Sequence, residues 1–220
     1  FDTAHPLRLP THYALKVLAA DLNGDGFKEL LFSGGDQLMI YWNDQGTFQP
    51  DHRTVLDIKG VDSQFSAGAL PMDIADVDGD GNPELLIGTI DGVEIRKTDR
   101  LDHAWKMLPC ANCMGVKAAD IRGMGRLDII AANVGQPNRV FFNDGKGGFS
   151  KSTEFGGEQN PSYSVAIADM DQDGDKDIVI GNVGQQNVIY FNEAKGTKYR
   201  SLSFGVATSA TYCVALGALN

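Results

Sequence analysis

Three short segments of the chain place oxygen-bearing side chains at relative positions 1, 3, 5 and 9 of a glycine-containing loop. Counting from the first acid, positions 1, 3, 5, 7 and 9 are Asp21, Asn23, Asp25, Phe27 and Glu29; then Asp76, Asp78, Asp80, Asn82 and Glu84; and then Asp169, Asp171, Asp173, Asp175 and Asp177. Ca²⁺ takes about six to eight oxygen ligands at about 2.3–2.6 Å, and alternating carboxylates in one tight loop supply most of them. The spacing therefore predicts about three calcium sites, one in each of these loops.

An EF-hand opens with the same Asp-x-Asp-x-Asp-Gly pattern, but it also needs a bidentate Glu at position 12 and flanking helices. Position 12 in this chain is Phe32, Ile87 or Ile180. Each loop leads directly into a short apolar run, such as 84–88, that is typical of a buried strand. The loops are therefore predicted to connect two strands.

A further loop, from Asp120 to Asp128, keeps the turn glycines and both terminal acids but loses the ligands between them. Arg122 and Met124 stand at positions 3 and 5. We therefore predict that this loop binds no calcium. A guanidinium from Arg122 or Arg126 is expected to neutralise the two terminal acids, the alternative being that both arginines point into solvent.

The loops belong to a longer repeat. The first loop positions recur at intervals of 55, 44, 49 and 49 residues, counting a last incomplete copy at Ala218. Each period holds about four strands, and the third strand is clearest at 38–43, 138–143 and 187–192. The repeats are expected at about 12–60, 66–109, 113–157 and 161–205, followed by the first strand of a further repeat at 210–220. A four-stranded unit with this period is the signature of a β-propeller blade.

We therefore expect an all-β protein, a β-propeller of four-stranded antiparallel blades with an acidic loop between the first and second strands. The acidic loop between an Ala-rich strand and an Ile/Leu-Gly strand resembles the FG-GAP or VCBS repeat of integrin-α-type propellers. Traces of the Phe-Gly and Ala-Pro element of that repeat remain at 65–71, 155–157 and 204–207. The resemblance covers nearly the whole chain. It implies that the innermost strand precedes each loop and that calcium lies at one rim of each blade.

The formal net charge of −10 is explained mainly by these loops, which hold twelve of the 29 acidic residues. Nucleic acid is not an expected partner, because phosphate binding needs clustered Lys and Arg. No apolar stretch is long enough to span a bilayer, so direct membrane insertion is not expected. We expect a secreted or cell-surface protein whose signal peptide is not in this sequence. The single strand expected at the end leaves open that the chain is part of a larger chain or assembly.

The three cysteines are Cys110, Cys113 and Cys213. The first two have the spacing of half a zinc site, but no second cysteine pair or nearby His supplies the remaining ligands. A local disulfide between Cys110 and Cys113 is expected, with free thiols as the alternative. Cys213 is expected to be a small buried core residue.

No catalytic constellation is found, because none of the four His residues accompanies a Ser or Cys in a nucleophile motif. The protein is therefore not expected to be an enzyme. Four aromatic residues are candidates for contact with a protein or carbohydrate ligand, the alternative being that they pack in the core: Trp42, Trp105, Tyr163 and Tyr190.

The function expected from the sequence is that of a calcium-binding extracellular propeller that serves as a ligand-binding or adhesion scaffold. One alternative is a polysaccharide-acting enzyme, or its accessory domain, built on the same repeats. A structural spacer within a larger surface protein is a third.

Overall fold

The computed structural model describes residues 8–11, 14–60, 70–157, 159 and 161–217. Within these residues the secondary structure is entirely β, arranged as four antiparallel sheets of four strands each. This confirms the predicted all-β class and the four-stranded antiparallel unit. No helix in the described part of the chain has the length and apolar character needed to cross a bilayer.

The strands of each sheet follow one another in chain order, so each sheet is a simple meander. Blade 1 holds β1 (Lys16–Ala20), β2 (Glu29–Gly34), β3 (Gln37–Asp44) and β4 (Thr47–Asp57), and blade 2 holds β5 (Met72–Ala75), β6 (Glu84–Gly88), β7 (Gly92–Lys97) and β8 (Lys106–Pro109). Blade 3 holds β9 (Cys113–Ala119), β10 (Asp128–Asn133), β11 (Asn138–Phe142) and β12 (Lys151–Phe155), and blade 4 holds β13 (Ser162–Ala168), β14 (Asp177–Asn182), β15 (Asn187–Asn192) and β16 (Tyr199–Phe204).

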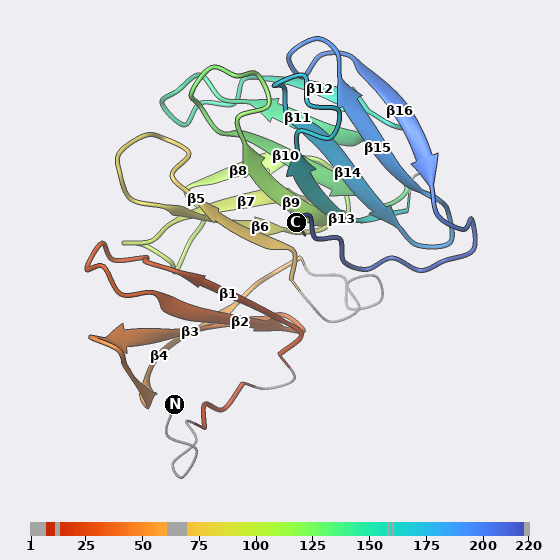
Figure 1. Cartoon of the computed structure of the whole chain (residues 1–220). Helices are drawn as coiled ribbons and strands as arrows, with labels where there is room; N and C mark the ends of the chain where they lie inside the picture. Colours follow the sequence, from red (N-terminus) through yellow and green to blue (C-terminus); the bar gives the residue numbers. More distant parts are fainter. Residues whose placement is uncertain (1–7, 12–13, 61–69, 158, 160, 218–220) are drawn as a thin grey trace.

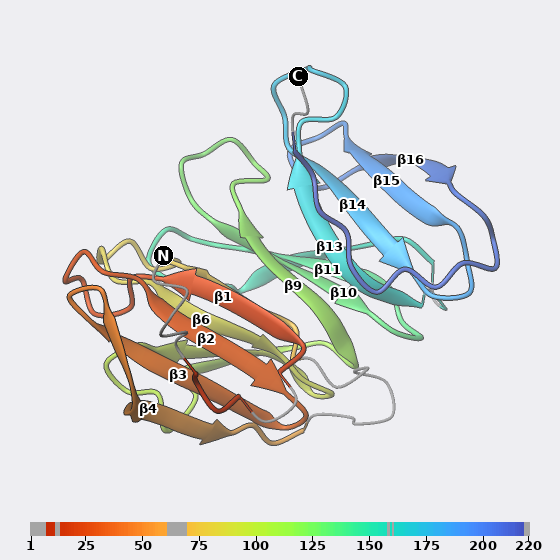
Figure 2. The same ribbon diagram turned by 60° about the horizontal axis from the view of Figure 1, so that its bottom comes forward.

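The four blades succeed one another around an arc, with blade 1 and blade 4 at its two ends (Figures 1 and 2). The first strands lie toward the inside of the arc, where β9 is beside both β5 and β13. The acidic loops join each inner strand to the second strand of the same blade. All four loops therefore occupy equivalent places in the fold.

The apolar core is divided into three clusters, and each cluster lies between two successive blades. Leu31 and Ile40 of blade 1 pack with Met72 and Leu85 of blade 2. The second cluster joins blades 2 and 3 in the same way, and the third joins blades 3 and 4. The residue at loop position 2 enters these clusters, as Leu22, Val77 and Ile121. Packing between blades therefore begins at the loops themselves.

The strand expected at 210–220 is not formed in its described part, which ends at residue 217. Ala210 makes an isolated bridge with Val183, and the amide of Thr211 donates to the Asn182 carbonyl at 3.0 Å. Further along, the amide of Val214 donates to the Ser164 hydroxyl instead of a backbone carbonyl, at 3.1 Å. The regular backbone ladder that a strand requires is therefore interrupted.

The cysteines also differ from expectation. All three are free thiols, so the expected Cys110–Cys113 disulfide is not formed, and Cys213 is exposed, not buried. Cys213 belongs to the irregular segment after blade 4, where no further described sheet covers it. The Cys113 Sγ atom lies 3.4 Å from the carbonyl oxygen of Gly115. A hydrogen bond with Cys113, reinforced by the charge of Arg139, lowers the pKa of Cys110, whereas the hydrogen bond with Cys110 and then burial raise the pKa of Cys113.

Alkylation of the native protein with iodoacetamide is expected to modify Cys213 and Cys110 before Cys113. The thiolate is the reactive species, and Cys113 is both fully buried and held in the thiol form. Peptide mass spectrometry after timed quenching measures the order. Equal labelling of Cys113, or recovery of a Cys110–Cys113 disulfide peptide, would contradict this structure of the pair.

Candidate metal centre

The aspartate at loop position 1 organises the turn. In the second loop, the two carboxylate oxygens of Asp76 accept hydrogen bonds from the amides of Gly79 at 2.7 Å and Gly81 at 2.9 Å. Both glycines have positive φ, +77° and +91°, a conformation that costs a residue with a Cβ atom about 1–2 kcal/mol. Asp21 and Asp169 bond the corresponding amides of their loops in the same way. The first acid therefore holds each loop closed.

The acid at position 9 is buried beneath the loop because it is also the first residue of the second strand. Glu29, Glu84 and Asp177 are completely buried. Each accepts a hydrogen bond from the amide at loop position 2, with distances of 2.6, 2.9 and 2.7 Å. Strand, loop and carboxylate are thus fixed together, and the acid has no access to water.

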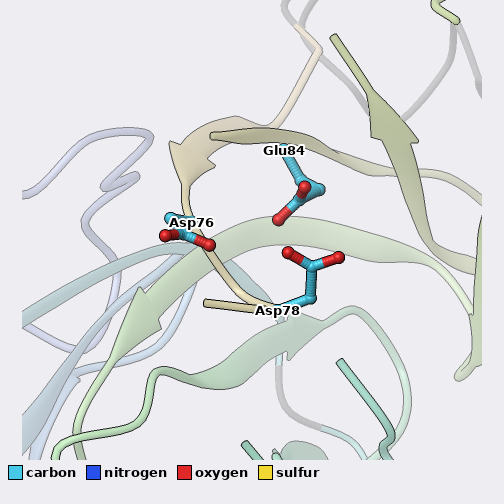
Figure 3. Close-up of side chains that lie close together, drawn as sticks. All are labelled: Asp76, Asp78 and Glu84. Atoms are coloured by element: carbon cyan, nitrogen blue, oxygen red, sulfur yellow. The ribbon is translucent and has the colours of Figure 1, made fainter. Parts of the chain in front are cut away.

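Carboxylates converge in the second and fourth loops. One oxygen from each of Asp76, Asp78 and Glu84 lies within 4.8 Å of the other two, and Asp169, Asp171 and Asp177 form the corresponding group. Figure 3 shows the carboxylates of Asp78 and Glu84 facing each other across the second loop. Like charges at this separation repel one another. A divalent cation with oxygen ligands fits both groups.

The first loop has Asn23 at position 3, where the second and fourth loops have an acid, and its amide donates to Asp25 Oδ2 at 3.0 Å. Here the Oε1 atom of Glu29 is buried and has no hydrogen-bond partner among the described residues. A buried carboxylate oxygen without a partner is costly, whereas a bound cation would compensate for it. This donor set therefore also fits Ca²⁺. The backbone amide of Phe27 donates to Asp25 Oδ1 at 2.8 Å.

The second loop contains a basic residue that the sequence analysis missed. The Nζ atom of Lys97 lies 2.8 Å from Asp80 Oδ2 and 3.1 Å from Glu84 Oε1, and it also donates to Asp78. The Glu84 Oε1 atom has this ion pair but no hydrogen bond of good geometry. Burial opposes the positive charge, but the bonds to the three acids outweigh it and raise the pKa of Lys97.

In the third loop an arginine pairs with Asp128, as expected, but the expected neutralisation of Asp120 is not seen among the described residues. The guanidinium of Arg122 makes a bidentate pair with the fully buried Asp128, at 3.0 Å from Nε and 2.7 Å from Nη2. Arg126 does not take part, because its Nη1 atom donates to the backbone carbonyl of Asp144 at 2.7 Å. Asp120 keeps its turn-forming role and accepts from the Met124 amide at 2.9 Å. The guanidinium of Arg122, with a single positive charge, thus lies where the side chains of the other loops converge.

The fourth loop is the most acidic, and the ion pair that reaches its acids comes from a neighbouring strand. Arg200 on β16 places Nη2 3.3 Å from Asp171 Oδ2, and both side chains are partly exposed. Desolvation, followed by the charges of Asp173 and Asp177, raises the pKa of Asp171. The negative charge of this loop is therefore only partly compensated.

The four aromatic candidates do not form one surface. Trp42 and Trp105 are partly buried and pack against the first and second core clusters. Tyr190 lies in the third cluster, with its ring edge-on to that of Phe155 at 5.0 Å between centroids. Tyr163 lines a separate cavity of about 310 Å³ along the inner strands. Trp42 also lines a cavity of about 420 Å³ between the first and second loops, with Asn23, Asp80 and Lys97 among its other lining residues.

The meandering four-stranded blades with acidic loops at equivalent places define a β-propeller-type repeat protein. The chain belongs to the FG-GAP-like repeat family, which matches residues 21–87 and 120–180. These two ranges include all four loops.

Three solved structures share the fold, each with a TM-score of 0.53. A lectin from Agrocybe aegerita that recognises non-reducing terminal N-acetylglucosamine is 21% identical, over 85% of this chain and 51% of the lectin. The Vibrio cholerae biofilm matrix protein Bap1 is 20% identical, over 86% of this chain and 28% of that one. BBS1N, in complex with ARL6DN, is 12% identical, over 87% of this chain and 51% of that one. No curated protein matches the chain significantly.

Proposed function

We propose that this chain is a calcium-binding, extracellular β-propeller segment that serves as a scaffold for a protein or carbohydrate ligand. The observation that carries the proposal is the buried acid at position 9, which in the first loop has an oxygen without a partner. The converging carboxylates of the second and fourth loops support it. Calcium would tie the end of each inner strand to the start of the next strand. We propose the extracellular setting together with the calcium role, since extracellular calcium-binding modules bind with Kd values of about 10⁻⁴–10⁻³ M.

Addition of Ca²⁺ to the EDTA-treated protein is expected to raise its thermal stability. With free Ca²⁺ at ten times Kd, each site adds about 1.4 kcal/mol to the free energy of unfolding. That corresponds to about 3–6 °C in Tm per site for a chain of this size. Differential scanning fluorimetry over a calcium series, with isothermal titration calorimetry for stoichiometry, measures both quantities.

Loop variants assign the effect to the proposed ligands. Glu29→Gln removes the buried charge of the first loop, and Asp177→Asn does so in the fourth, so each is expected to reduce the calcium-dependent shift. Asp51→Asn, an exposed acid on β4, is the matched control and is expected to keep the full shift. A Tm that is the same in EDTA and in millimolar Ca²⁺ would refute the calcium role.

The ligand site we favour is the cavity beside Trp42. It lies between two proposed calcium loops, and an indole ring offers a flat apolar face on which a sugar or a partner side chain can stack. The likeness to the Agrocybe aegerita lectin supports a search with N-acetylglucosamine-terminated glycans. Binding on a glycan array that requires Ca²⁺ and is lost in Trp42→Ala is the expected result. Retained binding in this variant would place the ligand elsewhere.

We propose binding without turnover. Bound Ca²⁺ would hold the acids of the loops ionised, which would make them poor general acids. Of the described histidines, His52 and His103 are exposed and pair only with the nearby Asp44 and Asp102. Release of product from a polysaccharide would instead favour the enzymatic alternative.

A further inference from the structure

The second loop already holds a cation of its own. The Lys97 ammonium contacts the acids at positions 3, 5 and 9, which are Asp78, Asp80 and Glu84. The acid at position 1, Asp76, is turned toward the loop amides. The ammonium therefore lies where the proposed calcium ligands converge, and the lysine side chain is only 20% exposed.

The position of Lys97 follows from strand register. Lys97 is the direct neighbour of Glu84 in the β6–β7 ladder. The corresponding pairs in the other blades, one residue beyond Leu30–Tyr41, Ile129–Phe141 and Ile178–Tyr190, put Trp42, Phe142 and Phe191 at this place. Among the four described blades, the second is therefore the one whose third strand sets a cation opposite the buried acid.

The basic groups that contact the third and fourth loops come from other positions in the fold. Arg122 comes from within the third loop, where it replaces a ligand, and Arg200 comes from the outer strand β16 and reaches the edge of the fourth loop. Among the described residues no ion pair involves an acid of the first loop, and the Oε1 atom of Glu29 has no hydrogen-bond partner. The loops thus form a graded series, in which the second keeps all its ligand residues and also has an internal competitor.

The Lys97 ammonium also has a second favourable contact, with the Trp105 ring. Its Nζ atom lies 4.8 Å from the centroid of the Trp105 ring, an arrangement that stabilises a cation over an aromatic face. An arriving Ca²⁺ would repel the ammonium from the carboxylates but leave this contact accessible. Lys106 lies over the same ring at 4.4 Å, with no ion pair to a loop acid.

We propose that Lys97 is a built-in competitor for calcium in the second loop, so that Ca²⁺ binds there more weakly than in the first and fourth loops and displaces the ammonium as it binds. This inference rests on the proposed calcium function. When calcium is low, the lysine neutralises the loop and keeps blade 2 folded. The second site then responds at a higher calcium concentration than its neighbours.

The test isolates the second loop in the Glu29→Gln/Asp177→Asn background and titrates Ca²⁺ by calorimetry. Lys97→Met in that background is expected to raise calcium affinity about 10- to 100-fold, because three charge-assisted contacts no longer have to be broken. Lys106→Met is the matched control, since it removes a cation over the same indole ring, and is expected to change affinity less than about twofold. Lys97→Arg, which keeps the charge, is expected to bind no more tightly than the parent.

Thermal stability in the absence of calcium gives a second readout, in which Lys97→Met is expected to be destabilising although it strengthens calcium binding. In EDTA, Lys97→Met is expected to melt below Lys106→Met, because three carboxylates lose their cation, and saturating Ca²⁺ should remove the difference. If Lys97→Met folds only in the presence of calcium, this supports the contact of Lys97 with the three loop acids. The free Ca²⁺ concentration at the midpoint of folding then gives the affinity. Unchanged or weaker calcium binding in Lys97→Met overturns the inference. If the unmodified protein shows no calcium-dependent heat or Tm shift, the proposed function itself fails.

Discussion

Replacing Arg122 with alanine is expected to lower the free energy of unfolding by about 3–5 kcal/mol. The change leaves the carboxylate of Asp128 ionised and fully buried without its bidentate partner. It also removes the bond from Arg122 Nη2 to the Asn143 carbonyl, at 2.5 Å, and the contact of the guanidinium with the Phe142 ring. Urea unfolding with an unchanged m-value measures the loss.

Two further variants separate the ion pair from general packing. Arg126→Ala lies in the same loop but removes only an exposed bond to a backbone carbonyl, so a change within about 0.5 kcal/mol is expected. Asp128→Asn in the Arg122→Ala background removes the buried charge and should restore a large part of the stability. Equal losses in Arg122→Ala and Arg126→Ala would show that the pair is not a structural substitute for a bound cation.

Replacing Asn143 with alanine is expected to cost about 2–4 kcal/mol. This buried amide donates to the Val77 carbonyl in the second loop at 2.5 Å and to the Leu127 carbonyl at 2.9 Å, and its oxygen accepts from the Gly145 amide at 2.8 Å. Removing the side chain leaves three backbone groups without a partner at the junction of blades 2 and 3. Asn192 makes the equivalent bond from blade 4 to Ile121, at 2.8 Å.

Asn43 provides the matched control because it occupies the same strand position in blade 1. Its side chain donates to the Lys28 carbonyl at 2.8 Å and accepts from the Gly46 amide at 2.7 Å, and both of these bonds stay within its own blade. Asn43→Ala is therefore expected to cost about 1 kcal/mol or less. Losses of the same size in the two variants, measured by urea unfolding, would mean that the inter-blade bond adds nothing.

The local features of this fold could be predicted from sequence because they lie within a few residues of one another. The acids of a loop, its glycines and the apolar strand that follows occupy about twelve successive residues, and the pattern recurs. The neutralisation of Asp128 by an arginine was open between two candidates. Only the turn geometry decides that Arg122 faces inward and Arg126 outward.

Lys97 escaped sequence analysis because it stands on the third strand, 13 positions after Glu84. Register alone brings the two together. Alignment of the third strands of the four repeats would have given the signal, since Lys97 stands where the other repeats have an aromatic residue. The exposure of Cys213 could not be predicted in the same way, because it depends on whether another sheet lies over its segment.

The division of the apolar core into three clusters between blades affects how this protein unfolds. Since every apolar cluster is shared by two neighbouring blades, a single blade excised from the chain would carry half-interfaces and no complete interior. Unfolding should then spread stepwise from one blade to the next, in the manner of a one-dimensional array, with the end blades fraying first because each has one described neighbour. Cations bound in the loops at those junctions would strengthen the coupling between adjacent blades. Their release would reduce the number of blades that unfold together as one cooperative unit.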